Sequence, residues 1–270
     1  MNSPTKVLAF TLAAAMTGAV GAGAGEGRDL TELAKTVQNP VADLISTHFQ
    51  YDIGFNAGPH NRSQHTLNVQ PFIPLHMSDD WNFIWRTTVP LVVWPDGPHD
   101  RSIAGLSDVD TTLLLSPKGA KKVPWGIGPI LTFPTGTRSA FTSGKWGAGP
   151  SAAILTIRGP VVAGAQVNNV WSYVGWGDKC VNEMELRPFI DYNIPGGWYA
   201  FTAPIITADW RAPKDQRWTV PFGGGIGRVF QIEDQPINVS VQAYYNVEHP
   251  DHAAEYSVSI EFTLLFPGEN

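Results

Sequence analysis

The charged side chains of this chain fall on one side of segments in which polar and apolar residues alternate. In the segment 255–266, Tyr256 and Val258 alternate with Ser257, Ser259 and Glu261. Successive side chains of a β-strand point to opposite faces, so such a segment has one apolar and one polar face. If the apolar face meets lipid, the charged face must line an interior, because Arg or Lys at the bilayer midplane costs ~2–4 kcal/mol. The residues expected to line this lumen are His48, Asp52, Arg86, Asp108, Asp110, Glu183, Glu185, Arg187, Asp191, Glu248 and Glu261.

This set of interior charges is compatible with two different interiors. One is the constriction of an open pore, and the other is a network of salt bridges and hydrogen bonds that fills a closed barrel. Arg86 and Arg187 stand among many carboxylates, and each buried charge must be paired or face water. An open lumen of this composition is expected to prefer cations or neutral solutes over anions.

Serine and histidine lie close together twice, in Ser46-Thr47-His48 and Ser63-Gln64-His65. A barrel hydrolase needs a serine nucleophile beside a histidine, with a polar group that orients the histidine. Neither motif continues into the His-x-Ser-Asn arrangement of outer-membrane lipases. We therefore assign no catalytic residue and expect no enzyme, with an outer-membrane hydrolase kept as an alternative.

A metal site has little support in the sequence. His249 and His252 could bind a metal together with His60 or His99 from other loops, but a helical histidine pair is lacking. The single cysteine, Cys180, excludes an internal disulfide and a cysteine-based metal site within one chain. No metal or cofactor is expected.

The N-terminal residues carry the pattern of an export signal. Lys6 precedes an apolar run at 7–20, and Ala22-Gly23-Ala24 is a small-residue cleavage site, which predicts a signal peptide over 1–24. A membrane anchor is the alternative. No later segment has the ~18 consecutive apolar residues that a membrane helix needs. Charged residues are only 16% of the chain, against roughly 25% in soluble proteins, and the net charge of −6 argues against nucleic-acid binding.

Residues 25–40 differ from the rest in their periodicity. Asp29 can cap a helix whose residues Leu30, Leu33, Ala34 and Val37 share one face, and Asn39-Pro40 ends it. This predicts a short periplasmic helix or a small plug at the mouth of a barrel, while an unstructured leader is the alternative.

Residues 41–270 are expected to form a transmembrane, antiparallel β-barrel of about twelve strands. Each run is long enough to cross a bilayer as a tilted strand, which takes ~9–11 residues. Short connections alternate with longer, more polar ones, as in outer-membrane barrels, and an even strand number places both termini on the periplasmic side. The predicted strands are 43–56, 64–77, 81–94, 104–116, 123–134, 144–157, 160–174, 182–194, 198–210, 217–230, 236–248 and 255–266.

Prolines inside the predicted strands conflict with this fold. Proline removes a donor from the β-ladder and is normally confined to edges and bulges, whereas a closed barrel has no edges. We expect these prolines to lie at bulges that bend the wall. They are Pro71, Pro90, Pro129, Pro150, Pro188, Pro204 and Pro221.

Six short motifs carry a family resemblance over roughly residues 33–267. They are Asn39-Pro40-Val41-Ala42-Asp43-Leu44-Ile45-Ser46, Leu67-Asn68-Val69-Gln70-Pro71-Phe72-Ile73-Pro74, Asp80-Trp81-Asn82, Gly126-Ile127-Gly128-Pro129, Lys145-Trp146-Gly147-Ala148-Gly149-Pro150 and Thr263-Leu264-Leu265-Phe266-Pro267. The sequence resembles the transporter-like outer-membrane proteins named for the meta-pathway of phenol degradation, often labelled neuromedin U. The resemblance implies a barrel in the bacterial outer membrane that handles aromatic compounds. The extension Gly268-Glu269-Asn270 departs from barrels that end on an aromatic residue, where the assembly signal lies.

The function expected from these observations is passive transport of a small solute through an outer-membrane barrel. Aromatic or hydrophobic solutes are the class that the resemblance implies, and the expected partners are outer-membrane lipid, the solute and the barrel-assembly machinery. The alternatives are a closed barrel with a structural or binding role and, from another class, the hydrolase.

Overall fold

The computed structural model describes residues 29–97, 101–119, 123–176 and 180–266. They form a closed antiparallel β-barrel of twelve strands with one short N-terminal helix, which confirms the predicted fold class. The elements are α2 (Leu30–Val37), β1 (Ile45–Ala57), β2 (Arg62–His76), β3 (Trp81–Gly97), β4 (Arg101–Leu106), β5 (Val109–Pro117), β6 (Trp125–Phe133), β7 (Lys145–Arg158), β8 (Val161–Gly175), β9 (Asn182–Ile194), β10 (Trp198–Thr202), β11 (Ile206–Asp209), a 3-10 turn (Lys214–Gln216), β12 (Trp218–Ile232), β13 (Gln235–Glu248) and β14 (Tyr256–Phe266). The predicted signal peptide, 1–24, and the C-terminal extension lie outside the described residues.

Two of the twelve predicted strands are each divided into two segments. The predicted run 104–116 breaks at Ser107 and Asp108, and its halves β4 and β5 both pair with β3. The predicted run 198–210 breaks at 203–205, and β10 and β11 both pair with β9 and β12. Pro204 lies in the second break, where it has no N–H to donate. The alternating pattern located the strands, but it did not show these interruptions.

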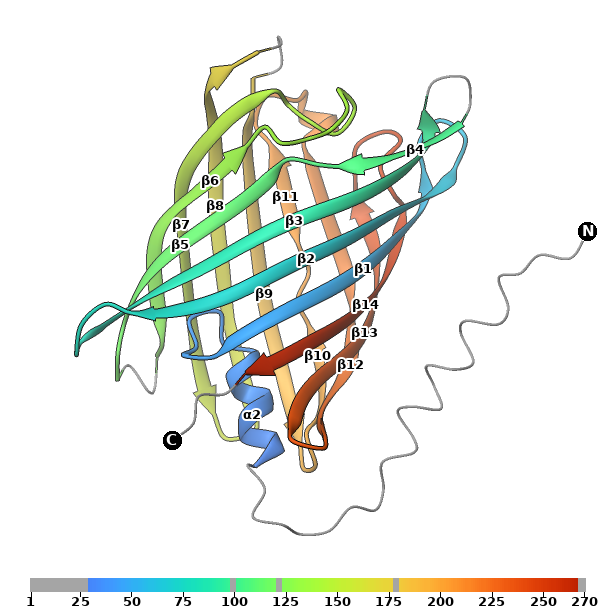
Figure 1. Ribbon diagram of the computed structural model, residues 1–270. Helices are drawn as coiled ribbons and strands as arrows, with labels where there is room; N and C mark the ends of the chain where they lie inside the picture. The colour runs from blue at the N-terminus through green and yellow to red at the C-terminus, as the bar shows by residue number, and fades with distance from the viewer. Residues whose placement is uncertain (1–28, 98–100, 120–122, 177–179, 267–270) are drawn as a thin grey trace, which may run out of the picture.

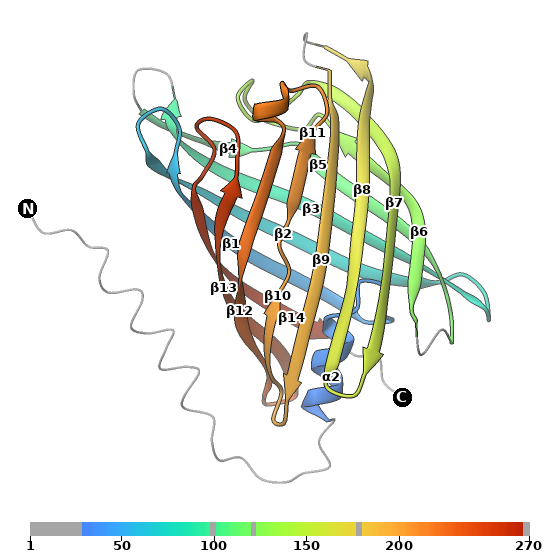
Figure 2. The same ribbon diagram turned by 180° about the vertical axis from the view of Figure 1, so that it is seen from behind.

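The barrel closes where its first strand meets its last. β1 pairs with β14 over its length, from Ile45 opposite Phe266 to Phe55 opposite Tyr256, without a register shift. The strands β2 and β13 continue the sheet on either side of this seam. Figures 1 and 2 show the wall wrapping around one interior.

The in-strand prolines do not follow the bulge prediction as a group. Pro221 lies at a register shift, and Pro90 lies beside the break between β4 and β5. Pro129 and Pro150, in contrast, are direct partners in an unshifted register. Four prolines lie at positions without a register shift: Pro71, Pro129, Pro150 and Pro188. Each of them has a neighbouring strand on one side with which it forms no pair, so no carbonyl there depends on the missing N–H. The bulge interpretation is therefore wrong for these four.

The burial pattern of the wall is inverted relative to a soluble protein. Polar side chains such as Gln50, Asn168 and Ser240 are buried inside the barrel. Large apolar side chains are exposed on the outer surface, for example Ile127, Ile154, Ile190, Phe222, Ile226 and Val247. A surface this apolar is suited to lipid, as in outer-membrane barrels.

The helix α2 lies at the lower end of the barrel in Figures 1 and 2, at the end where the tight turns gather. Its residues Leu33 and Ala34 pack against Tyr199, Val229 and Leu265 from the wall. A second cluster fills the same end, where Val41 of the segment after the helix contacts the inward-facing apolar residues Phe72, Ile84, Leu114, Leu155 and Phe189. The segment from the helix to β1 therefore occupies the lower mouth.

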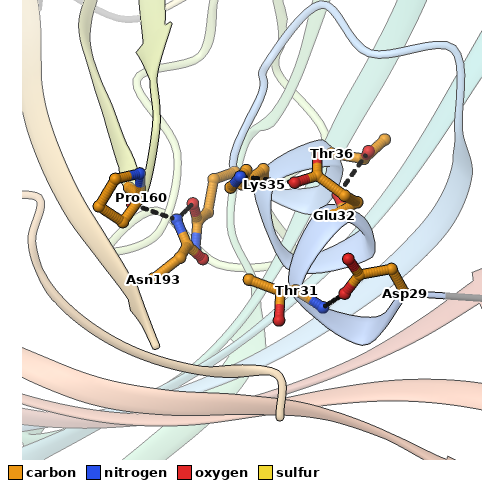
Figure 3. A network of polar contacts seen from close by, with 8 residues as sticks. Asp29, Thr31, Glu32, Lys35, Thr36, Pro160 and Asn193 are labelled. Carbon is orange, nitrogen blue, oxygen red and sulfur yellow. Dashed lines mark hydrogen bonds and ion pairs between the residues drawn. The ribbon is translucent and has the colours of Figure 1, made fainter. Parts of the chain in front are cut away.

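Polar contacts fix both ends of α2, as Figure 3 shows. The Asp29 carboxylate accepts a hydrogen bond from the Thr31 N–H at 2.9 Å and caps the helix, as predicted. At the other end, the Gln38 and Asn193 amides donate to each other at 3.0 and 2.9 Å, and Asn193 also donates to the Pro160 carbonyl at 3.1 Å. These bonds tie the end of the helix to β9. Within the described residues, no helix is both long and apolar enough to cross a membrane.

The facing of β14 is directly testable with adjacent cysteines in a Cys180→Ser background. Ser257 lines an interior cavity, whereas Val258 belongs to the alternate face. We expect Ser257→Cys to react with a membrane-impermeant thiol reagent in proteoliposomes, and Val258→Cys to be protected by lipid. Labelling of Val258→Cys with protection of Ser257→Cys would contradict the register.

Candidate functional site

Three cavities follow one another through the interior of the barrel. The outer vestibule, of about 1190 Å³, is bordered by connections at the upper end and lined by Asp108, Glu183 and Asp209. The middle cavity, of about 410 Å³, is lined by Asp52 and Asn68 among others. The inner cavity, of about 200 Å³, has residues 36–40 in its lining. Neighbouring cavities share lining residues, so together they run from the upper connections to the plug.

Ten of the eleven residues predicted on the polar face line these cavities. Asp108, Asp110, Glu183 and Glu185 line the outer vestibule. Asp110 and Glu185 also line the middle cavity, together with Asp52. Arg86 and Arg187 line both the middle and the inner cavity. The inner cavity is further lined by His48, Asp191 and Glu261. Glu248 is exposed and lines none of the three cavities. It is the last residue of β13 and pairs with Val220, beyond the register shift between Val220 and Pro221.

Asp108 orders the connection above the vestibule. Its carboxylate accepts hydrogen bonds from the backbone N–H groups of Gly136 and Ser143, at 3.1 and 2.8 Å, and from the Ser143 hydroxyl at 3.1 Å. Three donors satisfy this charge locally. Asp108 therefore fixes the shape of the connection above the vestibule.

Asp52 is satisfied in a similar way by the wall of the middle cavity. Gln50 and Ser259 donate to one carboxylate oxygen at 2.8 and 2.5 Å, and Asn68 donates to the other at 2.9 Å. The four residues come from β1, β2 and β14, so this network spans the closing seam. Both oxygens of the Asp52 carboxylate are therefore paired with neutral donors.

A serine, a histidine and a carboxylate form a chain in the inner cavity. The Ser46 hydroxyl lies 3.1 Å from His48 Nε2, and His48 Nδ1 lies 3.0 Å from Glu261 Oε1. Thr263 donates to the same Glu261 oxygen at 2.9 Å. The Ser46-Thr47-His48 motif was visible in the sequence, but its connection to Glu261 depends on the pairing of β1 with β14.

Arg86 crosses the interior to the opposite wall. From β3, its Nη1 donates to Gln166 Oε1 of β8 at 3.1 Å. Gln166 and Arg187 are register partners on β8 and β9, so both side chains stand on the same face. This group of three donors lies where the middle and inner cavities meet.

Sequence reasoning missed several lining residues because it selected charges on the clearest strands. Gln166, Asn168 and Gln242 are uncharged polar residues that line the cavities. Their positions in alternating segments were the available signal. Asp209, Arg211 and Arg217 also line the outer vestibule, and they come from the end of the broken strand β11 and from its connection to β12.

The histidines considered for a metal site do not form one in the described residues. No group of three or more His, Cys, Asp or Glu side chains in this part of the chain could hold a metal ion. His99 lies outside the described residues, whereas the His249 ring contacts the Pro250 carbonyl at 2.9 Å.

Comparison with solved structures places this fold among outer-membrane channels. No family model and no curated protein matches the sequence. The structure is similar to the COG4313 outer-membrane channel from Pseudomonas putida F1, with a TM-score of 0.62, 12% identity, and 83% of this chain and 94% of that chain covered. It is also similar to the NanC porin, with a TM-score of 0.54, 9% identity, and 83% and 100% covered. At these identities the likeness shows the fold: this chain has the barrel of outer-membrane channels and porins, and these two similar structures are not enzymes.

Proposed function

We propose that this protein is an outer-membrane channel for passive transport of small solutes, and that aromatic or hydrophobic compounds are among them. One observation carries the proposal: three adjoining cavities, each with several polar side chains in its lining, lie one after another inside a barrel whose outer surface is apolar. The inner cavity adds the aromatic side chains Phe72, Phe189 and Phe201 to its polar lining. Such a mixture suits a solute with an apolar body and a polar end. The likeness to outer-membrane channels and the six motifs of the phenol-pathway family agree with this proposal.

The proposed location is the bacterial outer membrane, after removal of residues 1–24. The barrel-assembly machinery would insert the strands, with α2 and the tight turns on the periplasmic side. The short turns and longer connections at opposite ends of the barrel support this orientation. The plug formed by α2 and the segment to β1 then lies at the periplasmic mouth.

The outer vestibule would set the preference among charged solutes. Glu183, Glu185, Asp110 and Asp209 line it, and the charge of Asp108 is already satisfied by the connection that it holds. An excess of carboxylates attracts small cations and repels small anions.

Liposome swelling and reversal potentials test the channel proposal together. Proteoliposomes should swell in small neutral solutes, and a salt gradient should give a reversal potential of the cation-preferring sign. Glu183→Gln combined with Glu185→Gln should reduce that potential, because two vestibule charges are removed. Asp234→Asn, in the turn between β12 and β13, is the matched control and should leave it unchanged. Absence of swelling in all solutes would favour a closed barrel, and an anion preference would contradict the assigned electrostatics.

A serine hydrolase is the second candidate function, because Ser46, His48 and Glu261 have the order of contacts found in such enzymes. In this reaction the Ser46 hydroxyl would attack an ester carbonyl while its proton passes to His48 Nε2. That proton would then leave with the alcohol, and water would release the acid from the acyl-serine. Glu261 would orient the ring through Nδ1.

A fluorophosphonate probe separates this candidate from the channel. A hydrolase should be labelled covalently in the wild type and not in Ser46→Ala, whereas a channel without this activity should be labelled in neither. Ser240→Ala, which removes another buried hydroxyl that lines the inner cavity, is the control. Because the two similar structures described above are a channel and a porin, we expect no labelling.

A further inference from the structure

The donor group that joins the middle and inner cavities contains buried N–H groups without an acceptor. Gln166 Oε1 accepts from Arg86 Nη1, which fixes the amide so that its nitrogen is the remaining polar atom. That Gln166 Nε2 has no hydrogen-bond partner, and neither does Arg187 Nε beside it. Gln166 is only 5% exposed. Buried donors are normally paired, and these two lie beside the cavities that Arg86 and Arg187 line, so an acceptor that enters there and reaches them would satisfy them.

The charge of this group favours an anionic acceptor. Among the described residues, no ion pair within 4 Å joins Arg86 or Arg187 to a carboxylate. Arg187 repels the charge of Arg86, whereas Glu185 and Asp110 attract it from a longer distance. One acid of the inner cavity, Glu261, is engaged by His48 and Thr263. A carboxylate is the group that two guanidinium ions and an amide N–H recognise best.

Each arginine has an aromatic neighbour on the same face. Phe72 is the register partner of Arg86 across β2 and β3, and Phe189 follows Arg187 by two residues on β9. Both phenylalanines line the inner cavity. A planar apolar ring in the inner cavity can contact both side chains that line it, while its polar end reaches the arginines.

The far end of the cavity limits the ligand to one acid group. Asp191 lies two residues beyond Phe189 on the same face of β9 and is 6% exposed. A second carboxylate on the ligand would meet this side chain, and like charges in a buried site repel strongly. A cavity of about 200 Å³ also suits a single ring.

We propose that Arg86, Gln166 and Arg187 form a binding site for the carboxylate of a one-ring aromatic monocarboxylic acid, whose ring contacts Phe72 and Phe189 in the inner cavity. The site deepens the proposed function, on which it rests, by naming a class of solute. It places selection at the junction of the middle and inner cavities, below an acidic vestibule. The vestibule repels small anions by long-range charge, so this site selects by contact among the few anions that pass it, and the channel as a whole keeps its preference for cations and neutral solutes.

The test measures the equilibrium binding of benzoate to the full mature protein in detergent by isothermal titration calorimetry. Benzyl alcohol is the uncharged analogue, acetate lacks the ring, and terephthalate carries a second carboxylate. Benzoate should bind more tightly than all three. Arg187→Gln should weaken benzoate binding about tenfold or more, because a charge-assisted contact is lost, and leave benzyl alcohol binding unchanged.

Arg228→Gln is the matched control, because Arg228 stacks on the Trp198 ring at 5.0 Å and lines none of the three cavities. It should bind benzoate like the wild type. If Arg187→Gln does not fold, Arg187→Lys replaces it, since lysine keeps the charge but loses the orphaned Nε donor; weaker benzoate binding is again expected. Folding is checked by migration before and after heating.

Equal affinity for benzoate and benzyl alcohol, or wild-type affinity in the arginine variants, would overturn the site. Tight terephthalate binding would contradict the role of Asp191. Swelling of proteoliposomes without benzoate binding would reject this site and would still support the proposed channel function. Benzoate binding that depends on Arg187 in a protein that never supports swelling would keep the site and reject transport.

Discussion

Closure of the backbone hydrogen-bond ladder between β1 and β14 is the constraint on which the rest of the structure depends. Lipid offers no partner for an exposed N–H or C=O group, and each unsatisfied group costs several kcal/mol, so a sheet that crosses a membrane must have no edge. The unshifted pairing from Ile45 opposite Phe266 to Phe55 opposite Tyr256 removes the edge. The same pairing brings Asp52 to Ser259 and His48 to Glu261, so closure and the interior polar networks form together.

A closed wall also separates the side chains that face lipid from those that face the interior. Each strand presents alternate residues to lipid and to the interior, so polar groups collect inside without a cost from the membrane. The lower end of this interior is filled by α2 and the segment to β1, and its upper part is open and acidic. Between them, Arg86 and Gln166 bridge opposite walls. The bridge and the plug are therefore the two places where side chains narrow the interior of the proposed channel.

Much of the architecture could be read from local periodicity. The alternation in 255–266 and 43–56 predicted the two strands that form the seam, and Asp29 with Leu33 predicted the capped helix that packs inside the mouth. These features depend on residues close in sequence. The positions of most charged residues along the cavities follow from the same alternation, because a face assignment needs no knowledge of the neighbouring strand.

Other features depend on contacts between distant residues and could not be predicted. The break at 203–205 lies opposite Pro188, and the four unshifted prolines are tolerated because a ladder gap faces each of them, which only the register shows. Gln166 carries no charge and drew no prediction, yet the reach of Arg86 across the barrel makes it part of the bridge. The link from Ser46 to Glu261 likewise required the pairing of the first strand with the last.

Single-channel recording in planar bilayers can decide whether the lumen is a route for solutes and whether the segment from α2 to β1 is its main barrier. The mature chain and a variant lacking residues 29–42 are compared after both are shown to be folded barrels. The account predicts small conductance steps for the mature chain and clearly larger steps for the shortened one, because the inner cavity loses part of its lining. Two folded proteins that conduct no ions would contradict the account and show a closed barrel.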